Sequence, residues 1–298
     1  MTTERLKMEP NNPIVTIDRA MMILIKLSEI GESVGITDLS EILNIPKASI
    51  YRILTTLEKR DFILQDEDTK RYSLGLTILR MSEKVQSQNI LLAISQKHLE
   101  YLAEMTGEVA SLGIIHSNKG LVIKSITSKS ASILTTKLGS IVEFHCSGLG
   151  KALLVDKTAD QIIEIIGSTL FPRYTQNTLT TLDQLLSKLE VVRETGLAFD
   201  NEETEEGLLC IATPIRDWND RTIAAISISA PKNRLIGQNL ENAKKIIKEA
   251  GENIHNSLNG IKEGKYSTEN GMPKLIGREI LRKRKSSAPN LVDHLPKR

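Results

Sequence analysis

Residues 36–63 read ITDLSEILNIPKASIYRILTTLEKRDFI, and this stretch decides the fold of the first part of the chain. It predicts a short helix after Thr37, a good N-cap, and then a tight turn at Asn44. Pro46 suits the first turn of a third helix, where its missing N–H costs nothing. Helical spacing of apolar residues predicts one buried stripe on that helix, made by Ile50, Ile53, Leu54 and Leu57.

The opposite side of this third helix is polar and basic. Between Pro46 and Arg60, four basic residues face one acidic residue, Glu58. Two short helices at a sharp angle, the second with a basic outer face, have the geometry that fits a DNA major groove. The stretch therefore predicts a helix-turn-helix.

The flanking sequence completes a winged helix-turn-helix domain over residues 13–75. A first helix is expected at 14–30, with Thr16 as its N-cap. The runs FILQ and KRYSLG, separated by DEDT, predict a β-hairpin that forms the wing. We expect base-edge contacts from Ser49, Tyr51 and Arg52, and backbone contacts from Lys47, Lys59, Lys70 and Arg71.

The quoted stretch resembles the winged helix-turn-helix of the IclR family of bacterial transcription regulators. Recognition helices of that family typically open with Pro-Lys-Ser-Thr, an apolar residue, His or Tyr, and Arg. This chain has PKASIYR at 46–52. Ala48 departs from the pattern and removes a hydroxyl that the family places near phosphate.

Length and composition limit the remaining possibilities. The chain has 298 residues, 40% of them hydrophobic, which allows two domains of roughly 100–200 residues each. No apolar run approaches the roughly 20 residues that cross a bilayer, so we expect no membrane partner and a cytoplasmic location. Two cysteines cannot form a disulfide framework, and zinc-ligand spacings are absent. No cofactor is expected.

The rest of the chain predicts a linker helix and an α+β domain. The linker helix covers 76–89, and a second domain covers 90–260. Extended segments, most of them joined by turns, alternate irregularly with helices near 90–106, 151–155, 159–166, 182–195 and 237–258. Without βαβ regularity, this order favours an antiparallel sheet with flanking helices.

The second domain also resembles the IclR family, in its effector-binding domain of GAF-like fold. The matching motifs are HCSGLGKALL at 145–154, and GLAFDNEETEEGLLCIATPIRD followed by IAAISISAP. The resemblance covers roughly residues 14–258. In members with small organic-acid effectors, residues at the matching positions line the effector pocket. These positions are Gly148, Leu149, Asp200, Cys210, Ser227 and Ser229, and Leu134 is a further candidate whose loop has no distinctive motif.

The residue chemistry of this set suits a small carboxylate. Ser227 and Ser229 are two apart and so point to the same face of their strand. Hydroxyls and helix-end amides donate hydrogen bonds to an anion, and Asp200 accepts one from a ligand hydroxyl. The plainer alternative for Cys210 is a small buried residue. The acidic residues at 202, 203, 205 and 206 are most simply a solvated loop.

The function predicted is a DNA-binding transcription regulator, most simply a repressor, whose operator affinity responds to a small organic acid. We expect a homodimer or a dimer of dimers on a pseudo-palindromic operator. An alternative is a sensor whose winged head binds protein. An enzyme is disfavoured, because no histidine lies in a recognisable catalytic constellation.

The C-terminal tail, residues 261–298, differs in composition from the rest. It contains ten Lys or Arg and four Asp or Glu, including the run RKRK at 282–285. Such composition predicts disorder. A solvated extension and a nucleic-acid-binding tail both remain open.

Overall fold

The computed structural model describes residues 14–131, 137–259, 266–269 and 272–275. The chain divides into two compact units, one ending at Gln86 and the other beginning at Ser87. Helix α4 (Leu76–Gln88) contains this boundary, in agreement with the predicted linker helix.

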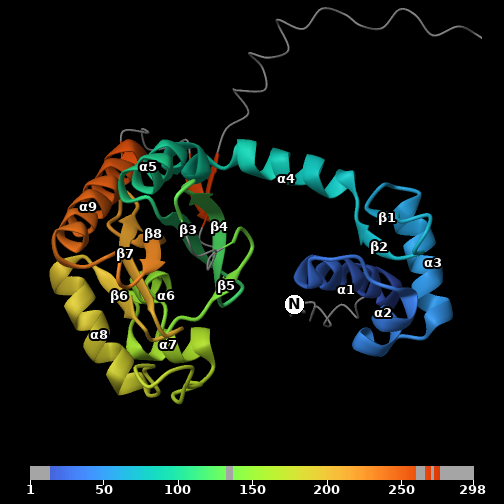
Figure 1. The fold of residues 1–298 in the computed structure, drawn as a ribbon, viewed down its shortest axis with the longest axis horizontal. Coiled ribbons are helices and arrows are strands. Elements are labelled where there is room, and N and C mark those ends of the chain that lie inside the picture. The colour runs from blue at the N-terminus through green and yellow to red at the C-terminus, as the bar shows by residue number, and fades with distance from the viewer. Residues whose placement is uncertain (1–13, 132–136, 260–265, 270–271, 276–298) are drawn as a thin grey trace, which may run out of the picture. The chain divides into compact units, whose positions relative to one another are not determined.

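The first unit packs helices against a small hairpin (Figure 1). Its elements before α4 are α1 (Val15–Ile30), α2 (Ile36–Leu43), α3 (Lys47–Glu58), β1 (Ile63–Gln65) and β2 (Tyr72–Leu74). The stripe predicted on α3 is buried, and it packs on Ile23 of α1, Leu39 of α2 and Ile63 of β1. Each such side chain stabilises the fold by about 1.5–3 kcal/mol.

Glycine is required where the hairpin passes the end of α3. A Cβ on Gly75 would lie 2.2 Å from the carbonyl oxygen of Asp61. The amide of Gly75 also donates to the carbonyl of Phe62 at 2.8 Å. This close approach ties the strand that leaves the wing to the residues just after α3.

Two predicted helix caps are wrong. Helix α1 starts at Val15 with Ile14 at the N-cap, so Thr16 lies inside the helix. Helix α2 starts after Gly35, whose amide donates to the Asp38 carboxylate at 3.4 Å. An acidic residue in the first turn satisfies the free amide and the helix dipole, and Thr37 is therefore not needed as a cap.

The second unit is built on one antiparallel sheet with the strand order β5-β4-β3-β8-β7-β6. The strands are β3 (Val109–His116), β4 (Lys119–Thr127), β5 (Ile141–Val142), β6 (Ala198–Asn201), β7 (Leu208–Arg216) and β8 (Thr222–Pro231). The central pair, β3 and β8, joins strands that lie about a hundred residues apart in the chain. This is the α+β architecture that the sequence predicts.

Helices cover both faces of this sheet (Figure 1). On one face lie α5 (Ile90–Thr106) and α9 (Gly237–Asn259). On the other lie α6 (Gly148–Leu154), α7 (Ala159–Ile166) and α8 (Leu182–Thr195). The period of two along each strand sends alternate residues to these two cores.

Helix α6 begins earlier than predicted. It starts at Gly148 rather than at Lys151, because the hydroxyl of Ser147 caps it by accepting from the amide of Gly150 at 2.9 Å. The predicted helices 159–166 and 182–195 are found with those bounds.

The described part of the tail contains paired strands. β9 (Tyr266–Glu269) and β10 (Met272–Leu275) form an antiparallel pair where the composition predicted disorder. The basic run at 282–285 lies outside the described residues.

Candidate functional site

The outer face of α3 presents most of the side chains predicted to meet DNA. The exposed residues are Lys47, Tyr51 and Arg52 on α3 and Lys59 directly after it. Tyr51 is 59% exposed. The hydroxyl of Thr56 donates to the Arg52 carbonyl at 2.9 Å within the helix. A major groove admits an α-helix of this kind.

Ser49 is less available than predicted. It is half-buried, and its hydroxyl accepts from the guanidinium of Arg19 at 3.3 Å. Arg19 comes from α1, and the sequence analysis did not single it out. Helical spacing places Arg19 in line with Ile23 and Leu27, the buried residues of α1, but it does not reveal which residue of another helix Arg19 contacts.

The two basic residues of the wing differ in their surroundings. Lys70 is exposed at the turn between β1 and β2. The Arg71 side chain is half-buried: its Nε donates to the Ser33 carbonyl at 2.8 Å, and its guanidinium lies 3.7 Å from the Asp38 carboxylate. Arg71 therefore ties the wing to α2.

The tip of the wing is acidic. Residues 66–68 are Asp-Glu-Asp and all three are exposed. The Thr69 hydroxyl and amide each donate to the Asp66 carboxylate at 2.7 Å, and these bonds lower the pKa of that carboxyl. The tip thus carries negative charge at neutral pH, beside the cation of Lys70.

A cavity of about 280 Å³ lies in the second unit, beside the start of α6 on the α6 face of the sheet. Five of the seven predicted pocket residues line it: Leu149, Asp200, Cys210, Ser227 and Ser229. The other lining residues were not among those predicted for the pocket, namely Ile141, Val142, Glu143, Ser147, Tyr174, Thr204, Glu205 and Leu208. Leu134 lies outside the described residues.

Strand register places the polar floor of this cavity. Ser229 of β8 pairs with Cys210 of β7, and Ser227 pairs with Ser111 of β3. The hydroxyl of Ser111 lies 3.2 Å from that of Ser125 on β4. A row of hydroxyls therefore crosses the sheet from β8 through β3 to β4. The alternation along β8 had predicted that Ser227 and Ser229 point to the same face of that strand.

Both cysteine thiols are neutral. Burial raises the pKa of the Cys210 thiol to about 11 and that of the Cys146 thiol to about 12. A nucleophilic cysteine needs a lowered pKa, so neither group suits covalent chemistry.

Gly148 does not line the cavity. A Cβ there would lie 3.1 Å from the Cys210 sulfur and 3.4 Å from the Asp200 amide nitrogen. Glycine allows the start of α6 to approach β6 and β7. Leu149 does line the cavity, and its side chain packs over Gly113 of β3.

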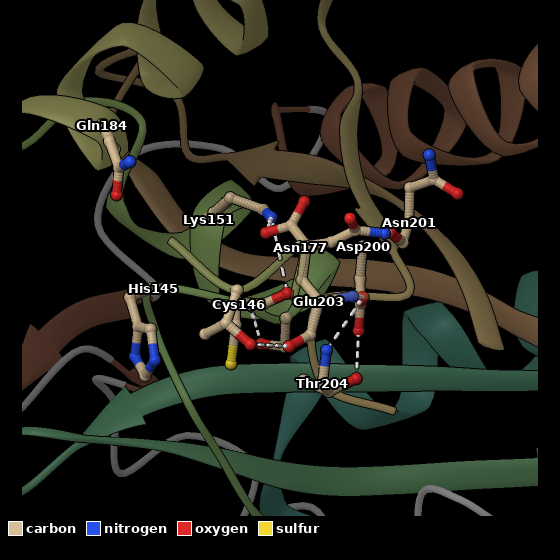
Figure 2. A network of polar contacts seen from close by, with 12 residues as sticks. His145, Cys146, Lys151, Asn177, Gln184, Asp200, Asn201, Glu203 and Thr204 are labelled. Carbon is tan, nitrogen blue, oxygen red and sulfur yellow. Dashed lines mark hydrogen bonds and ion pairs between the residues drawn. The ribbon is translucent and has the colours of Figure 1, made fainter. Parts of the chain in front are cut away.

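Asp200 is buried, and its carboxylate is largely occupied by its own loop (Figure 2). Its Oδ1 accepts from the amides of Glu203 at 2.7 Å and Thr204 at 3.2 Å, and the Thr204 hydroxyl donates to Oδ2. Burial raises the pKa of Asp200 against the opposing effect of these bonds. The predicted role of accepting from a ligand hydroxyl therefore competes with a role in shaping the loop.

The acidic segment at 202–206 is not wholly solvated, contrary to the prediction. Glu203 is 6% exposed and forms an ion pair with Lys151 of α6, which is 1% exposed. The pairing joins residues 52 positions apart, so no local pattern reveals it. Glu205, by contrast, is exposed and lines the cavity.

Aromatic stacking fixes one side of the cavity. The ring of His145 stacks on Phe171 at 5.0 Å and on Tyr174 at 5.9 Å between centroids. Its Nε2 lies 3.0 Å from the Pro172 carbonyl oxygen, and burial lowers the pKa of His145. A neutral His145 thus holds the segment that brings Tyr174 to the cavity.

Metal clusters and membrane-spanning helices are both absent from the described parts of the chain. Within residues 14–131, 137–259 and the two tail strands, no group of three or more His, Cys, Asp or Glu residues could hold a metal ion. Among the same residues, no helix is both long enough and apolar enough to span a membrane.

A winged helix-turn-helix joined to a separate domain with a small polar cavity defines the class of ligand-responsive DNA-binding regulators. Comparison with family models supports this assignment and makes it specific. Residues 16–67 match the IclR helix-turn-helix domain, and residues 83–256 match the C-terminal domain of bacterial IclR transcriptional regulators. The chain belongs to the IclR family, whose members are transcriptional regulators and not enzymes.

Individual proteins similar to this chain are transcriptional regulators as well. The chain is 31% identical over 246 residues to the HTH-type transcriptional repressor AllR of Salmonella paratyphi A, covering 83% of this chain and 90% of that protein. The crystal structure of IclR from Thermotoga maritima matches with a TM-score of 0.69 at 26% identity, covering 83% of this chain and all of that one.

A third likeness concerns the fold alone. An IclR homolog from Microbacterium hydrocarbonoxydans, crystallised with 4-hydroxybenzoate, matches with a TM-score of 0.73 at 19% identity. It covers 82% of this chain and 99% of that one.

Proposed function

We propose that this regulator is a repressor that binds a DNA operator through α3 and releases or retains it according to a small acid in the cavity of its second unit. The observation that carries the proposal is the presence of two separate features in one chain. One is an exposed basic face on α3, and the other is a cavity floored by Ser227 and Ser229. The repressor role is that of the AllR relatives.

At the operator, we assign base-edge contacts to Tyr51 and Arg52, supported by their exposure on α3. Lys47, Lys59 and Lys70 are exposed cations suited to phosphates. Ser49 and Arg71 are partly engaged inside the unit, so we assign them supporting roles: Ser49 with Arg19, and Arg71 in holding the wing.

We propose that the effector is a small carboxylate held by neutral hydrogen-bond donors. The lining contains the hydroxyls of Ser227 and Ser229, but its ionisable side chains are acidic: Glu143, Asp200 and Glu205. A carboxylate bound there is held by hydroxyls and amides and not by an ion pair. The complex of the Microbacterium homolog with 4-hydroxybenzoate supports an acid as the ligand class.

A homodimer or a dimer of dimers supports binding to a pseudo-palindromic operator. Apolar side chains left exposed within the first unit support such an assembly, namely Ile14 just before α1, Val15, Ile17, Met21, Met22 and Ile25 on α1, and Leu76, Leu79, Met81 and Val85 on α4. A regulator of chromosomal DNA acts in the cytoplasm, which is where we place this protein.

The test combines a thermal-shift screen with a mobility-shift assay on the full-length chain. The screen uses pyruvate, gluconate and 4-hydroxybenzoate as representative short keto, sugar and aromatic acids. The mobility shift uses DNA from upstream of the protein's own gene. We expect one class of acid to raise the melting temperature and to change the mobility shift.

Salt dependence separates DNA binding from the alternative in which the winged head binds protein. If Lys and Arg neutralise phosphates, the DNA affinity falls steeply as salt rises. A chain that retards no DNA at low salt contradicts the proposal.

A further inference from the structure

Lys151 and Glu203 form a buried ion pair beside the proposed effector cavity. Neither side chain lines that cavity. Both line a second cavity of about 440 Å³, which also touches Phe199 and Leu209 from the opposite face of strands β6 and β7. The pair therefore lines the second cavity and lies next to the proposed effector cavity.

The ammonium of Lys151 joins two segments that contribute to the effector cavity (Figure 2). It donates to the Glu203 carboxylate, and at 3.4 Å to the carbonyl of Cys146. Cys146 directly precedes Ser147, the N-cap of α6, which lines the cavity. Glu203 directly precedes Thr204, which lines it from the loop after β6.

The backbone of Glu203 is itself held on both sides. Its amide donates to Asp200 at 2.7 Å, and its carbonyl accepts from the Thr178 hydroxyl at 2.6 Å. Thr178 ends the segment that includes the cavity residue Tyr174, whose amide donates to the Thr178 hydroxyl at 3.0 Å. The ion pair thus connects α6 to the loop of residues 202–207, and the backbone of Glu203 connects that loop to the segment around Tyr174.

The buried charges of Lys151, Glu203 and Asp200 depend on one another. Burial raises the pKa of both Asp200 and Glu203, and the Lys151 ammonium opposes that rise at each carboxyl. Removing one partner unbalances the buried charges, whereas replacing both with apolar residues of similar volume removes two opposite charges together and leaves Asp200 to the hydrogen bonds of its own loop. The second cavity gives the loop a space into which it can relax.

We infer that Lys151 and Glu203 are positioning residues for the effector cavity: they touch no effector, but they hold its α6 wall and its loop wall at the spacing that an effector needs. This inference rests on the proposed function of the cavity. It adds a requirement for effector affinity to residues outside the lining.

Three variants test the inference in the full-length protein: Lys151→Met, Glu203→Gln, and the apolar double variant Lys151→Met with Glu203→Leu. The control is Lys232→Met, which removes the more exposed partner of Glu202 on the same loop. Hydrogen exchange at the amides of residues 201–207 is measured without ligand. Calorimetric affinity for pyruvate, gluconate and 4-hydroxybenzoate is measured alongside the melting temperature.

A positioning role predicts different recoveries for stability and for binding. Both single variants melt earlier, and the double variant regains part of the melting temperature because the two opposite charges of the pair are removed together, while Asp200 keeps the hydrogen bonds from its own loop. All three exchange their loop amides faster and bind the acid about 2- to 30-fold more weakly. Lys232→Met resembles the wild type in loop exchange and affinity.

Two results overturn the inference. One is a double variant whose loop exchange and acid affinity both match those of the wild type, which assigns the pair to stability alone. The other is unchanged loop exchange in the single variants. A wild-type chain that binds none of the three acids instead contradicts the proposed acid effector, while the exchange measurement still decides whether the pair holds the loop.

Discussion

Arg52→Ala is the substitution that most sharply tests how the first unit meets DNA. Arg52 lies exposed on α3, between the buried residues Ile50 and Ile53 of the core stripe. Its side chain makes no hydrogen bond or ion pair with any residue in the described ranges. Its removal therefore changes the free energy of unfolding by no more than about 0.5 kcal/mol.

The expected loss in operator affinity is much larger. A good bidentate contact of arginine to guanine contributes about 1–3 kcal/mol of discrimination. A dimer presents two such residues, so the loss is about 2–6 kcal/mol, or roughly 30-fold to more than 10,000-fold. Loss of charge alone gives a smaller effect that all DNA sequences share.

The assay is fluorescence anisotropy with a labelled operator and a scrambled duplex of equal length. The matched control is Arg80→Ala, which removes an exposed arginine from α4 in the same unit. We expect Arg52→Ala to lower operator affinity strongly, to lower scrambled-duplex affinity slightly, and to leave the melting temperature unchanged. Equal losses on both duplexes, or a loss no larger than that of Arg80→Ala, refute the assignment of Arg52 to a base edge.

Three other predictions concern phosphate contact, the cavity and pH. Lys47→Ala weakens binding to all sequences alike and reduces the salt slope by about 1 per protomer, as measured by anisotropy at several salt concentrations; an unchanged slope contradicts a phosphate contact. Ser229→Ala removes a hydrogen bond to a charged ligand, so the binding free energy of the acid, measured by calorimetry, becomes less favourable by about 1.5–3 kcal/mol. The DNA affinity without acid stays the same. Burial raises the pKa of the Cys210 thiol from its ordinary value of 9.0 to about 11 in the folded protein. The contribution of this thiol to the free energy of unfolding is therefore fully present below pH 9.0 and is lost as pH rises through 11. Denaturant unfolding between these pH values shows a smaller loss of stability in Cys210→Ala, and identical slopes contradict it.

Local sequence predicts the first unit well because its elements are set by short-range patterns. The stripe on α3, Pro46 at its start and the turn at Asn44 all act within a few residues, and Asn44 adopts the left-handed conformation there. The starts of α1 and α2 were missed because neither helix is capped by a threonine side chain: α1 follows Ile14 without a side-chain cap, and Asp38 in the first turn of α2 accepts from the Gly35 amide.

The cavity residues likewise include some that local spacing predicts and others that it does not. Ser227 and Ser229 were placed on one face of one strand by period two, and register then brings Cys210 beside Ser229. The arrival of Tyr174 from a distant segment and the burial of Glu203 against Lys151 depend on long-range contacts that no spacing encodes.

The wing illustrates how tertiary contacts redirect a local prediction. Arg71 and Lys70 are adjacent cations in the sequence and were given the same role. The carbonyl of Ser33 and the carboxylate of Asp38 engage Arg71, and these partners lie more than thirty positions earlier in the chain. Lys70 is the more exposed of the two, whereas the Arg71 guanidinium is already engaged by these partners.

We propose that acid bound in the second unit and DNA bound by the first are coupled in one protein. The direct measurement is a linkage experiment: operator affinity with and without saturating acid, and acid affinity with and without saturating operator. Coupling of about 1–3 kcal/mol predicts a 5- to 150-fold change, equal in both directions. An acid that binds the wild-type chain tightly and leaves its operator affinity unchanged contradicts the account.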